Sequence, residues 1–226
     1  MTEATGLFDP MALAIVMVGT ILATFAREGW QDVRTAIASA ASLTRKGFDA
    51  GATRSALART VGAINRVGHL GAEPVDPPDD ATTSLLNAYI RSGSIDAMMK
   101  LARTQRIERD IRSVAATRVY ETASELAPVF GLVGTLFSIT QLMPDMENSA
   151  TDIVMASVAG AVLSSLYGVL SANLLFSPLA RAIERRSDKE EAERSLLLEW
   201  FEGELTDGRS KPSRMTIEPE GLRGAA

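Results

Sequence analysis

A stretch of 28 residues, from Ile153 to Ala180, contains no charged side chain. A helix of that length is about 42 Å long, which exceeds the ~30 Å hydrocarbon core of a membrane. A helix on the surface of a soluble protein would show a polar face at 3.6-residue spacing, whereas this stretch shows only small polar residues. The sequence therefore predicts a membrane-spanning helix here.

Two further uncharged stretches, Ala127–Met143 and Pro10–Ala26, have 17 residues each. The first lies near the lower limit for crossing a membrane but can be extended backward, so we predict a span over residues 119–143. The second is followed by Arg27 and Trp30, a basic and aromatic pair typical of a membrane interface. A buried core helix is the alternative for this second stretch.

Basic residues are sharply segregated along the chain. Of 23 Lys and Arg, 14 lie between Arg27 and Arg118 and 9 between Arg181 and Arg223. Since basic loops remain in the cytoplasm, this distribution predicts an N-out, C-in topology. We expect an all-α integral membrane helical bundle with three transmembrane helices and a helical cytoplasmic loop domain. Its expected order is a periplasmic stub (1–9), a span (10–26), the cytoplasmic loop domain (27–118), a span (119–143), a periplasmic turn (144–152), a span (153–180), a cytoplasmic helix (181–205) and a disordered tail (206–226).

The expected cytoplasmic loop domain is helical by its hydrophobic pattern. We predict helices at Trp30–Gly47, Ser55–Val67, Thr83–Arg91 and Ser94–Arg118, the last running without a break into the second span. The segment Gly71–Asp80 carries three prolines and is expected to be a non-helical hinge. After the third span, we expect Arg181, Arg185 and Arg186 to lie at anionic lipid headgroups.

Composition argues against several classes of function. The chain has no cysteine and a single histidine, His69, which disfavours a metal cluster or a catalytic triad. The net charge of −5 gives no sign of a nucleic-acid partner. No nucleophile–base pair or phosphate-binding loop is recognisable. We expect neither an enzyme nor a bound cofactor or metal.

The spans carry regularly spaced small residues. In lipid, such spacing lets helix backbones approach closely. The expected packing residues are Gly131, Gly134, Gly160, Gly168 and Ala172. One interpretation is that these are packing faces of an ordinary helical bundle. The other is that neighbouring hydroxyls line a hydrated ion pathway, with Thr135, Ser138, Ser164 and Ser165 as the candidates.

A cation pathway in this chain would be incomplete. No Asp, Glu, Lys, Arg or His occurs in any of the three uncharged stretches. A proton or cation pathway needs a titratable group at membrane depth, so a partner would have to supply it. Pro128 and Pro178 stand where the second span begins and the third ends. They either punctuate the helices or form a hinge pair that couples ion passage to movement.

Two motifs carry a resemblance to a known family. Residues 125–135, ELAPVFGLVGT, resemble the AP-x-x-G-x-x-GT signature of the MotA/TolQ/ExbB proton-channel family. Residues 164–180, SSLYGVLSANLLFSPLA, resemble the pattern TTLYG-x-x-x-AN-x-x-F-x-PLA of its flagellar MotA branch. Residues 7–40 are similar to the segment that enters the second membrane helix of that branch. The similarity covers most of residues 7–200 and is most specific in the last two spans.

The resemblance implies a mechanism. Family members form a five-membered ring around two membrane helices of a single-span, MotB-like partner, whose membrane Asp carries the ion. Ion flow turns the ring, which pushes a rotor protein through the cytoplasmic loop. Thr135 and Ser165 match the two pore-facing hydroxyl positions, and Pro128 and Pro178 match the paired prolines that couple ion passage to movement. Arg66 and Glu73 are candidate rotor contacts, with ordinary solvent-exposed charge as the alternative.

Departures from the MotA pattern leave alternatives open. The chain starts at the equivalent of the second MotA helix, which gives the three-span layout of TolQ and ExbB, yet Gly160 stands where ExbB carries a glutamate. We therefore expect an ion-channel subunit of a MotA-like stator in the bacterial inner membrane. The alternatives are an ExbB/TolQ-type energiser with an ExbD/TolR-like partner, and a non-conducting membrane scaffold. The choice between H⁺ and Na⁺ depends on the partner.

Overall fold

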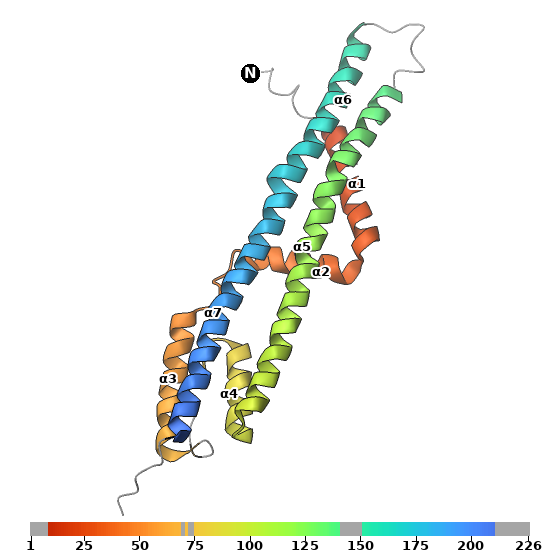
Figure 1. The fold of residues 1–226 in the computed structure, drawn as a ribbon. Helices are drawn as coiled ribbons and strands as arrows, with labels where there is room; N and C mark the ends of the chain where they lie inside the picture. Colours follow the sequence, from red (N-terminus) through yellow and green to blue (C-terminus); the bar gives the residue numbers. More distant parts are fainter. Residues whose placement is uncertain (1–8, 69–70, 72–74, 141–150, 211–226) are drawn as a thin grey trace, which may run out of the picture. The chain divides into compact units, whose positions relative to one another are not determined.

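The computed structural model describes residues 9–68, 71, 75–140 and 151–210, and all regular structure within these ranges is helical (Figure 1). The elements are α1 (Pro10–Glu28), α2 (Trp30–Ser42), α3 (Ala50–Val67), α4 (Asp80–Ser92), α5 (Ile95–Thr140), α6 (Thr151–Leu170), the π-helix η3 (Ser171–Phe176) and α7 (Ser177–Ser210). Three helical runs are long and apolar enough to cross a membrane: Pro10–Glu28, Ile95–Thr140 and Val154–Asp207. The expected all-α class and its three membrane spans are confirmed.

The described residues divide into two compact units, which we describe separately. The membrane unit contains the described residues of 1–47 and 107–190, and the loop unit contains those of 48–106 and 191–226. The membrane unit thus holds α1, α2, α6, η3, most of α5 and the beginning of α7. The loop unit holds α3, α4, the first turns of α5 and the end of α7.

Helix α1 begins and ends at residues suited to those positions. Asp9 is the N-cap, and its carboxylate accepts hydrogen bonds from the backbone N–H groups of Met11 (2.9 Å) and Ala12 (3.1 Å). Pro10 follows at the first helical position, where its missing N–H costs nothing. At the other end Gly29 has φ 84°, a conformation that favours glycine, so the chain leaves α1 and starts α2.

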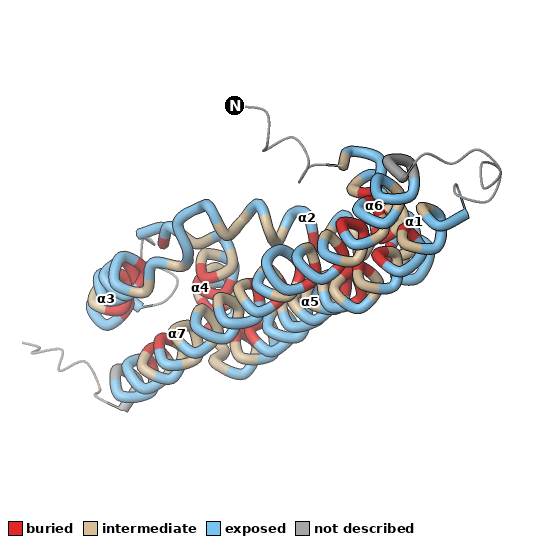
Figure 2. The backbone as a smooth tube through the Cα atoms, turned by 90° about the horizontal axis from the view of Figure 1, so that it is seen from above, coloured by how far each residue is buried: buried red, intermediate tan, exposed pale blue. Residues whose placement is uncertain are grey.

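The membrane unit packs through small residues and leaves large apolar side chains outside. Figure 2 shows buried residues where α1, α5 and α6 face one another. On α1 the buried residues recur every four positions, at Ala12, Val16, Thr20 and Thr24. Exposed large apolar side chains include Leu22, Leu136 and Leu174, at 63%, 64% and 72% exposure. Such exposure is unfavourable in water, and a lipid environment explains it.

A single helix, α5, contains both the expected helix from Ser94 and the second span. It runs from Ile95 to Thr140 over 46 residues with Pro128 inside it. The prediction of an unbroken helix is confirmed. Its polar half belongs in part to the loop unit, where Ser94 caps the first turn by accepting a hydrogen bond from the N–H of Ala97 (3.3 Å).

The loop unit is a small bundle with its own core. Buried apolar residues of α3, α4, α5 and α7 pack together, and the fully buried members include Leu57, Leu86, Met98 and Phe201. Helix α4 begins at the N-cap Asp79 and ends at Gly93, whose φ of 62° is the left-handed C-cap conformation. The described residues of the proline-rich segment, 75–79, are non-helical as expected.

Several boundaries differ from those expected. Helix α2 ends at Ser42 rather than Gly47, because the Arg186 guanidinium donates hydrogen bonds to the carbonyl oxygens of Ser42 (2.7 Å) and Arg45 (3.1 Å). Because its guanidinium forms these hydrogen bonds within the protein, Arg186 does not have the position expected for it at lipid headgroups. Arg181 and Arg185 are exposed.

The boundary expected between the last helix and a disordered tail at residue 206 is also wrong. Helix α7 continues to Ser210. In its last turns the buried Leu205 packs into the loop-unit core, and the Thr206 hydroxyl donates to the Glu202 carbonyl oxygen at 2.8 Å. Residues 1–8 of the expected stub, residues 144–150 of the expected turn and residues 211–226 of the expected tail lie outside the described residues. Helix α6 already begins at Thr151, inside the segment expected to be that turn.

Candidate functional site

Helices α5 and α6 meet through two glycines. A Cβ placed on Gly168 would lie 2.7 Å from the carbonyl oxygen of Ala127, 3.0 Å from the Cα of Gly131 and 3.1 Å from the Cα of Pro128. A Cβ on Gly131 would lie 3.0 Å from the carbonyl oxygen of Ser164. Because these neighbours are backbone atoms, only glycine allows the two helices to approach so closely.

One turn away, Gly134 faces the side chain of Ser164. A Cβ on Gly134 would lie 2.7 Å from the Ser164 hydroxyl oxygen. Ser164 is fully buried, and its hydroxyl donates to the carbonyl oxygen of Gly160 at 3.0 Å. The structure therefore places this candidate pathway residue inside the contact between α5 and α6.

Gly160 lies against two polar side chains. A Cβ there would lie 3.2 Å from a carboxylate oxygen of Asp9 and 3.4 Å from the hydroxyl oxygen of Ser138. Ser138 is half-buried and donates to the carbonyl oxygen of Gly134 at 3.0 Å. The backbone N–H of Asp9 also donates to the Tyr167 hydroxyl at 3.0 Å. The beginning of α1 is thereby fixed to α6, and a carboxylate and the candidate Ser138 both lie against Gly160.

The remaining hydroxyl candidates lie at the edge of this contact. Ser165 is half-buried, and its Cα is 3.3 Å from the position of a Cβ on Gly131. Thr135 is half-buried too, and its hydroxyl donates to the carbonyl oxygen of Leu132 at 2.7 Å. Both oxygens retain acceptor capacity. An ion, a water or a partner's side chain could be bound by such groups.

The two prolines lie in different helical surroundings. Pro128 is half-buried inside α5, against Gly168. Pro178 is exposed near the start of α7, directly after the π-helix η3. In this wider turn the N–H of Ser177 donates to the carbonyl oxygen of Ala172, which is five residues back.

The π-helix was not predicted from the sequence. The same carbonyl of Ala172 accepts a second hydrogen bond, at 3.2 Å, from the Ser124 hydroxyl of α5. Ala172 is itself buried beside Ala127, with Ala123 and Phe176 in the same cluster. The two proline-bearing helices therefore contact each other through an irregular turn, a kind of geometry that is frequent at functional sites.

A buried carboxylate at the end of α1 was also missed. The side chain of Glu28 is 3% exposed. It accepts a hydrogen bond from the Thr122 hydroxyl at 2.8 Å and lies 3.2 Å from the Arg118 guanidinium. Nearby, Arg27 and Glu125 form a weaker exposed pair at 3.6 Å. The sequence places charges after the first span, but no local pattern marks which of them is buried.

The candidate rotor contacts belong to the loop unit. Arg66 is exposed near the end of α3, and its guanidinium donates to the carbonyl oxygen of Gly62 at 3.1 Å. Glu73 lies outside the described residues. In the described part of the chain, no group of three or more His, Cys, Asp or Glu residues is placed to hold a metal ion.

Known proteins with similar sequences include proteins named for motility and for chemotaxis. The chain is 31% identical over 88 residues to Motility protein A of Borreliella burgdorferi, a match that covers 39% of this chain and 33% of the relative. It is 29% identical over 90 residues to chemotaxis protein PomA of Vibrio alginolyticus, covering 40% of this chain and 35% of the relative. The matched part of the chain thus spans about a third of the length of these relatives.

Solved structures share the fold. The flagellar MotAB stator complex of Bacillus subtilis matches with a TM-score of 0.74 and 19% identity, covering 88% of this chain and 79% of the other. The C. jejuni MotAB structure matches with a TM-score of 0.77 and 15% identity, covering 89% and 79%.

A family model gives the most direct assignment. The model of the MotA/TolQ/ExbB proton channel family matches residues 78–195, more than half of the chain. This range contains the glycine contact between α5 and α6, both prolines and the π-helix. With three helices long and apolar enough to cross a bilayer, the chain is a membrane protein of a channel family rather than of an enzyme family. The chain belongs to the MotA/TolQ/ExbB proton channel family.

Proposed function

We propose that the chain is the ion-channel subunit of a MotA-like stator complex, which converts ion flow across the bacterial inner membrane into flagellar rotation. The observation that carries this proposal is the edge of the α5–α6 contact. Thr135 and Ser165 present half-buried hydroxyls there, and the uncharged stretches that hold them, residues 127–143 and 153–180, contain no Asp, Glu, Lys, Arg or His. Such a wall can coordinate water or an ion but cannot carry a proton alone.

The missing titratable group defines the partner. A MotB-like protein with a single membrane span and an Asp at membrane depth would supply the carboxylate. Several copies of this chain, five by resemblance, would surround it. The names of the similar proteins support this choice, since they include a Motility protein A and MotAB complexes. The restriction of Lys and Arg to residues 27–118 and 181–223 supports an N-out, C-in orientation.

Mechanical coupling would use the irregular turn. In this proposal, protonation of the partner's Asp changes the contact at Thr135 and Ser165. The change reaches Pro128 and Pro178, where helical hydrogen bonding is already interrupted and the cost of bending is low. The loop unit then transmits the movement to a rotor protein, with Arg66 and Glu73 as candidate contacts.

Removing both hydroxyls tests the conduction step. Thr135→Ala with Ser165→Ala should abolish ion-dependent function, measured as swimming and as acidification of cells that express the complex. The assembled complex should still be recovered at normal yield. The control, Thr104→Ala with Thr206→Ala, removes two hydroxyls that bond to their own helices in the loop unit and should leave function intact. Normal function of the first double variant would refute conduction and favour a non-conducting scaffold.

Co-purification of the partner protein distinguishes a motor stator from an ExbB/TolQ-type energiser. A partner with a peptidoglycan-binding domain would support the motor. An ExbD- or TolR-like partner linked to TonB or TolA would instead support an energiser of outer-membrane transport or envelope integrity.

A further inference from the structure

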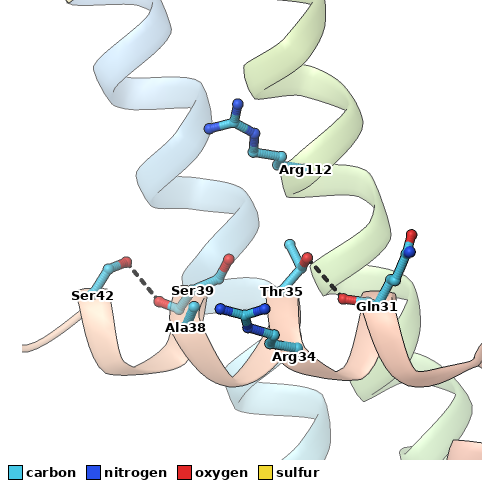
Figure 3. Close-up of a pocket in the computed structure, with 7 residues that line it drawn as sticks. All are labelled: Gln31, Arg34, Thr35, Ala38, Ser39, Ser42 and Arg112. Carbon is cyan, nitrogen blue, oxygen red and sulfur yellow. Dashed lines mark hydrogen bonds between the residues drawn. The ribbon is translucent and has the colours of Figure 1, made fainter.

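A cavity of about 550 Å³ lies in the membrane unit between α2 and α5 (Figure 3). Its polar lining consists of Gln31, Arg34, Thr35, Ser39 and Ser42 of α2 and Arg112 of α5. No acidic side chain lines it in the part of the chain that the structure describes. The volume is in the range of small-molecule sites, ~300–1,000 Å³. The proposed ion pathway does not use this cavity.

The cavity has two available cations on different helices. Arg34 has no ion pair among the described residues and is exposed. Arg112 lies 3.4 Å from Glu108, but both side chains are more than half exposed, at 69% and 58%. An exposed pair of this kind contributes little and can open to a competing anion. The net electrostatic preference of the cavity is therefore for an anion.

Hydroxyls supply additional donors and acceptors. The Thr35 hydroxyl donates to the Gln31 carbonyl oxygen at 2.9 Å, and the Ser42 hydroxyl donates to the Ser39 carbonyl oxygen at 2.6 Å (Figure 3). The Ser39 hydroxyl has no hydrogen bond within the described residues. It is therefore free to donate to a ligand, together with the two guanidinium groups.

The helices that carry these groups are held firmly together. Ala36 of α2 is buried against Ala116 and Val119 of α5 and Ile183 of α7, and the Tyr120 hydroxyl donates to the Ala36 carbonyl oxygen at 3.2 Å. At the end of α2 the Arg186 guanidinium bonds to the Ser42 carbonyl oxygen and to Glu190. Arg34 and Arg112 therefore project from a fixed frame, which lowers the entropic cost of binding.

A second, smaller cavity continues the first. It has about 190 Å³ and shares Ser39, Ser42 and Arg112 with it, while adding Arg109 and Arg186. Glu190 is the one acidic residue that lines it among the described residues, and Arg186 neutralises that charge at 2.9 Å. The lining of this second cavity thus holds three guanidinium groups, those of Arg109, Arg112 and Arg186, and one carboxylate.

From this arrangement we propose that the cleft between α2 and α5 binds a phosphate group. Two guanidinium forks, each matched to phosphate geometry, and a free hydroxyl offer more donors than one planar carboxylate can accept. A tetrahedral phosphate group with several anionic oxygens can accept them all. The phosphate could belong to a soluble phosphate ester or to a lipid headgroup. Along α5, Arg112 lies 13 residues before Glu125, the residue at the edge of the apolar span. The two residues are therefore separated by about 20 Å of helix.

Binding to the full chain in nanodiscs distinguishes these sources. In nanodiscs of phosphatidylcholine, inorganic pyrophosphate is titrated by calorimetry, with malonate as the dicarboxylate comparison. In nanodiscs that contain phosphatidylglycerol, retained lipid is counted by native mass spectrometry. Arg34→Gln with Arg112→Gln should weaken the binding at least tenfold. The control, Arg59→Gln with Arg103→Gln, removes the same charge from exposed positions of the loop unit and should leave the dissociation constant within twofold.

Each binding result either supports the phosphate site or overturns it. Arginine-dependent pyrophosphate binding supports the site with a soluble ligand, and arginine-dependent phosphatidylglycerol retention supports it with a lipid. Binding of neither, equal binding by the double variant, or malonate binding as tight as pyrophosphate binding overturns the proposal. If circular dichroism shows that the glutamine variant is unfolded, Arg34→Lys with Arg112→Lys replaces it. That variant keeps the charge but loses the bidentate forks, so it should still bind less tightly.

Discussion

The guanidinium of Arg194 donates two hydrogen bonds, of 2.7 and 2.9 Å, to the carboxylate of Asp79, although the two residues are 115 positions apart in the sequence. Their side chains are 13% and 19% exposed. The same carboxylate caps α4 by accepting hydrogen bonds from the N–H (2.9 Å) and hydroxyl (2.8 Å) of Thr82. Behind it, the guanidinium stacks over the ring of Phe48, 4.1 Å from its centroid. One pair thus joins α7 to the start of α4 within the loop unit.

Removing this pair should destabilise the loop unit. Arg194→Ala leaves a partly buried carboxylate without its cation and exposes the Phe48 ring. We expect a loss of about 2–3 kcal/mol, the magnitude of a charge-assisted hydrogen bond that is left unmade. Chemical denaturation followed by the fluorescence of Trp200, which lies in the loop unit, measures it. Arg59→Ala, at an exposed position, is the control and should cost less than about 0.5 kcal/mol. Equal effects would contradict the assignment.

The same carboxylate should make stability fall in acid. Burial raises the pKa of Asp79, but hydrogen bonds from Arg194 and Thr82 outweigh it, and the pKa lies below its ordinary value of 3.8. The folded state then binds fewer protons than the unfolded state, so this contribution is present above pH 3.8 and disappears as pH falls through the folded pKa. Unfolding free energies measured from about pH 5 downward should show a steeper decline for the native chain than for Asp79→Asn. Parallel curves would be inconsistent with the lowered pKa.

Residue types and spacing were enough to predict the main architecture. The uncharged stretch from Ile153 predicted a span, and the absence of Gly and Pro from Ile95 to Ala127 predicted one continuous helix. The family motifs selected the segments in which Gly131 meets Gly168. Each of these signals is local, because helix formation and membrane insertion depend on neighbouring residues.

Features that depend on distant partners could not be predicted. The π-helix has a non-local contact, since Ser124 of α5 donates to the Ala172 carbonyl oxygen 48 positions away. The burial of Glu28 requires Thr122, 94 positions away. The phosphate cleft needs α2 to lie across α5, which no pattern in either helix specifies (Figure 3). Such relations arise only when the chain is packed.

Substituting the glycine at the helix contact should loosen the membrane unit. Gly168→Ala would place its Cβ 2.7 Å from the Ala127 carbonyl oxygen, so the backbones of α5 and α6 must separate. We expect a cost of about 1–3 kcal/mol, typical of overpacking, and a lower Tm in detergent. Gly62→Ala is a matched control inside α3, where no atom lies within 4 Å of the new Cβ, and it should stabilise by about 0.5–1 kcal/mol. A Tm for Gly168→Ala at or above that of the native chain would show that the contact is not close-packed.

Glu28 should contribute more to stability than its exposed neighbours. Arg118→Ala leaves a carboxylate that is 3% exposed, with the Thr122 hydroxyl as its one remaining partner among the described residues, and we expect a loss of about 1–3 kcal/mol. Arg27→Ala breaks the neighbouring pair with Glu125, whose side chains are 56% and 68% exposed, and should cost less than about 1 kcal/mol. Adding Glu28→Gln to Arg118→Ala removes the unpaired charge and should recover part of the loss. A double-mutant cycle measured by thermal unfolding in detergent gives the coupling free energy between the two side chains. If the effects of Glu28→Gln and Arg118→Ala are simply additive, the buried carboxylate does not depend on Arg118, and α1 is held to α5 by packing and by the Thr122 hydrogen bond.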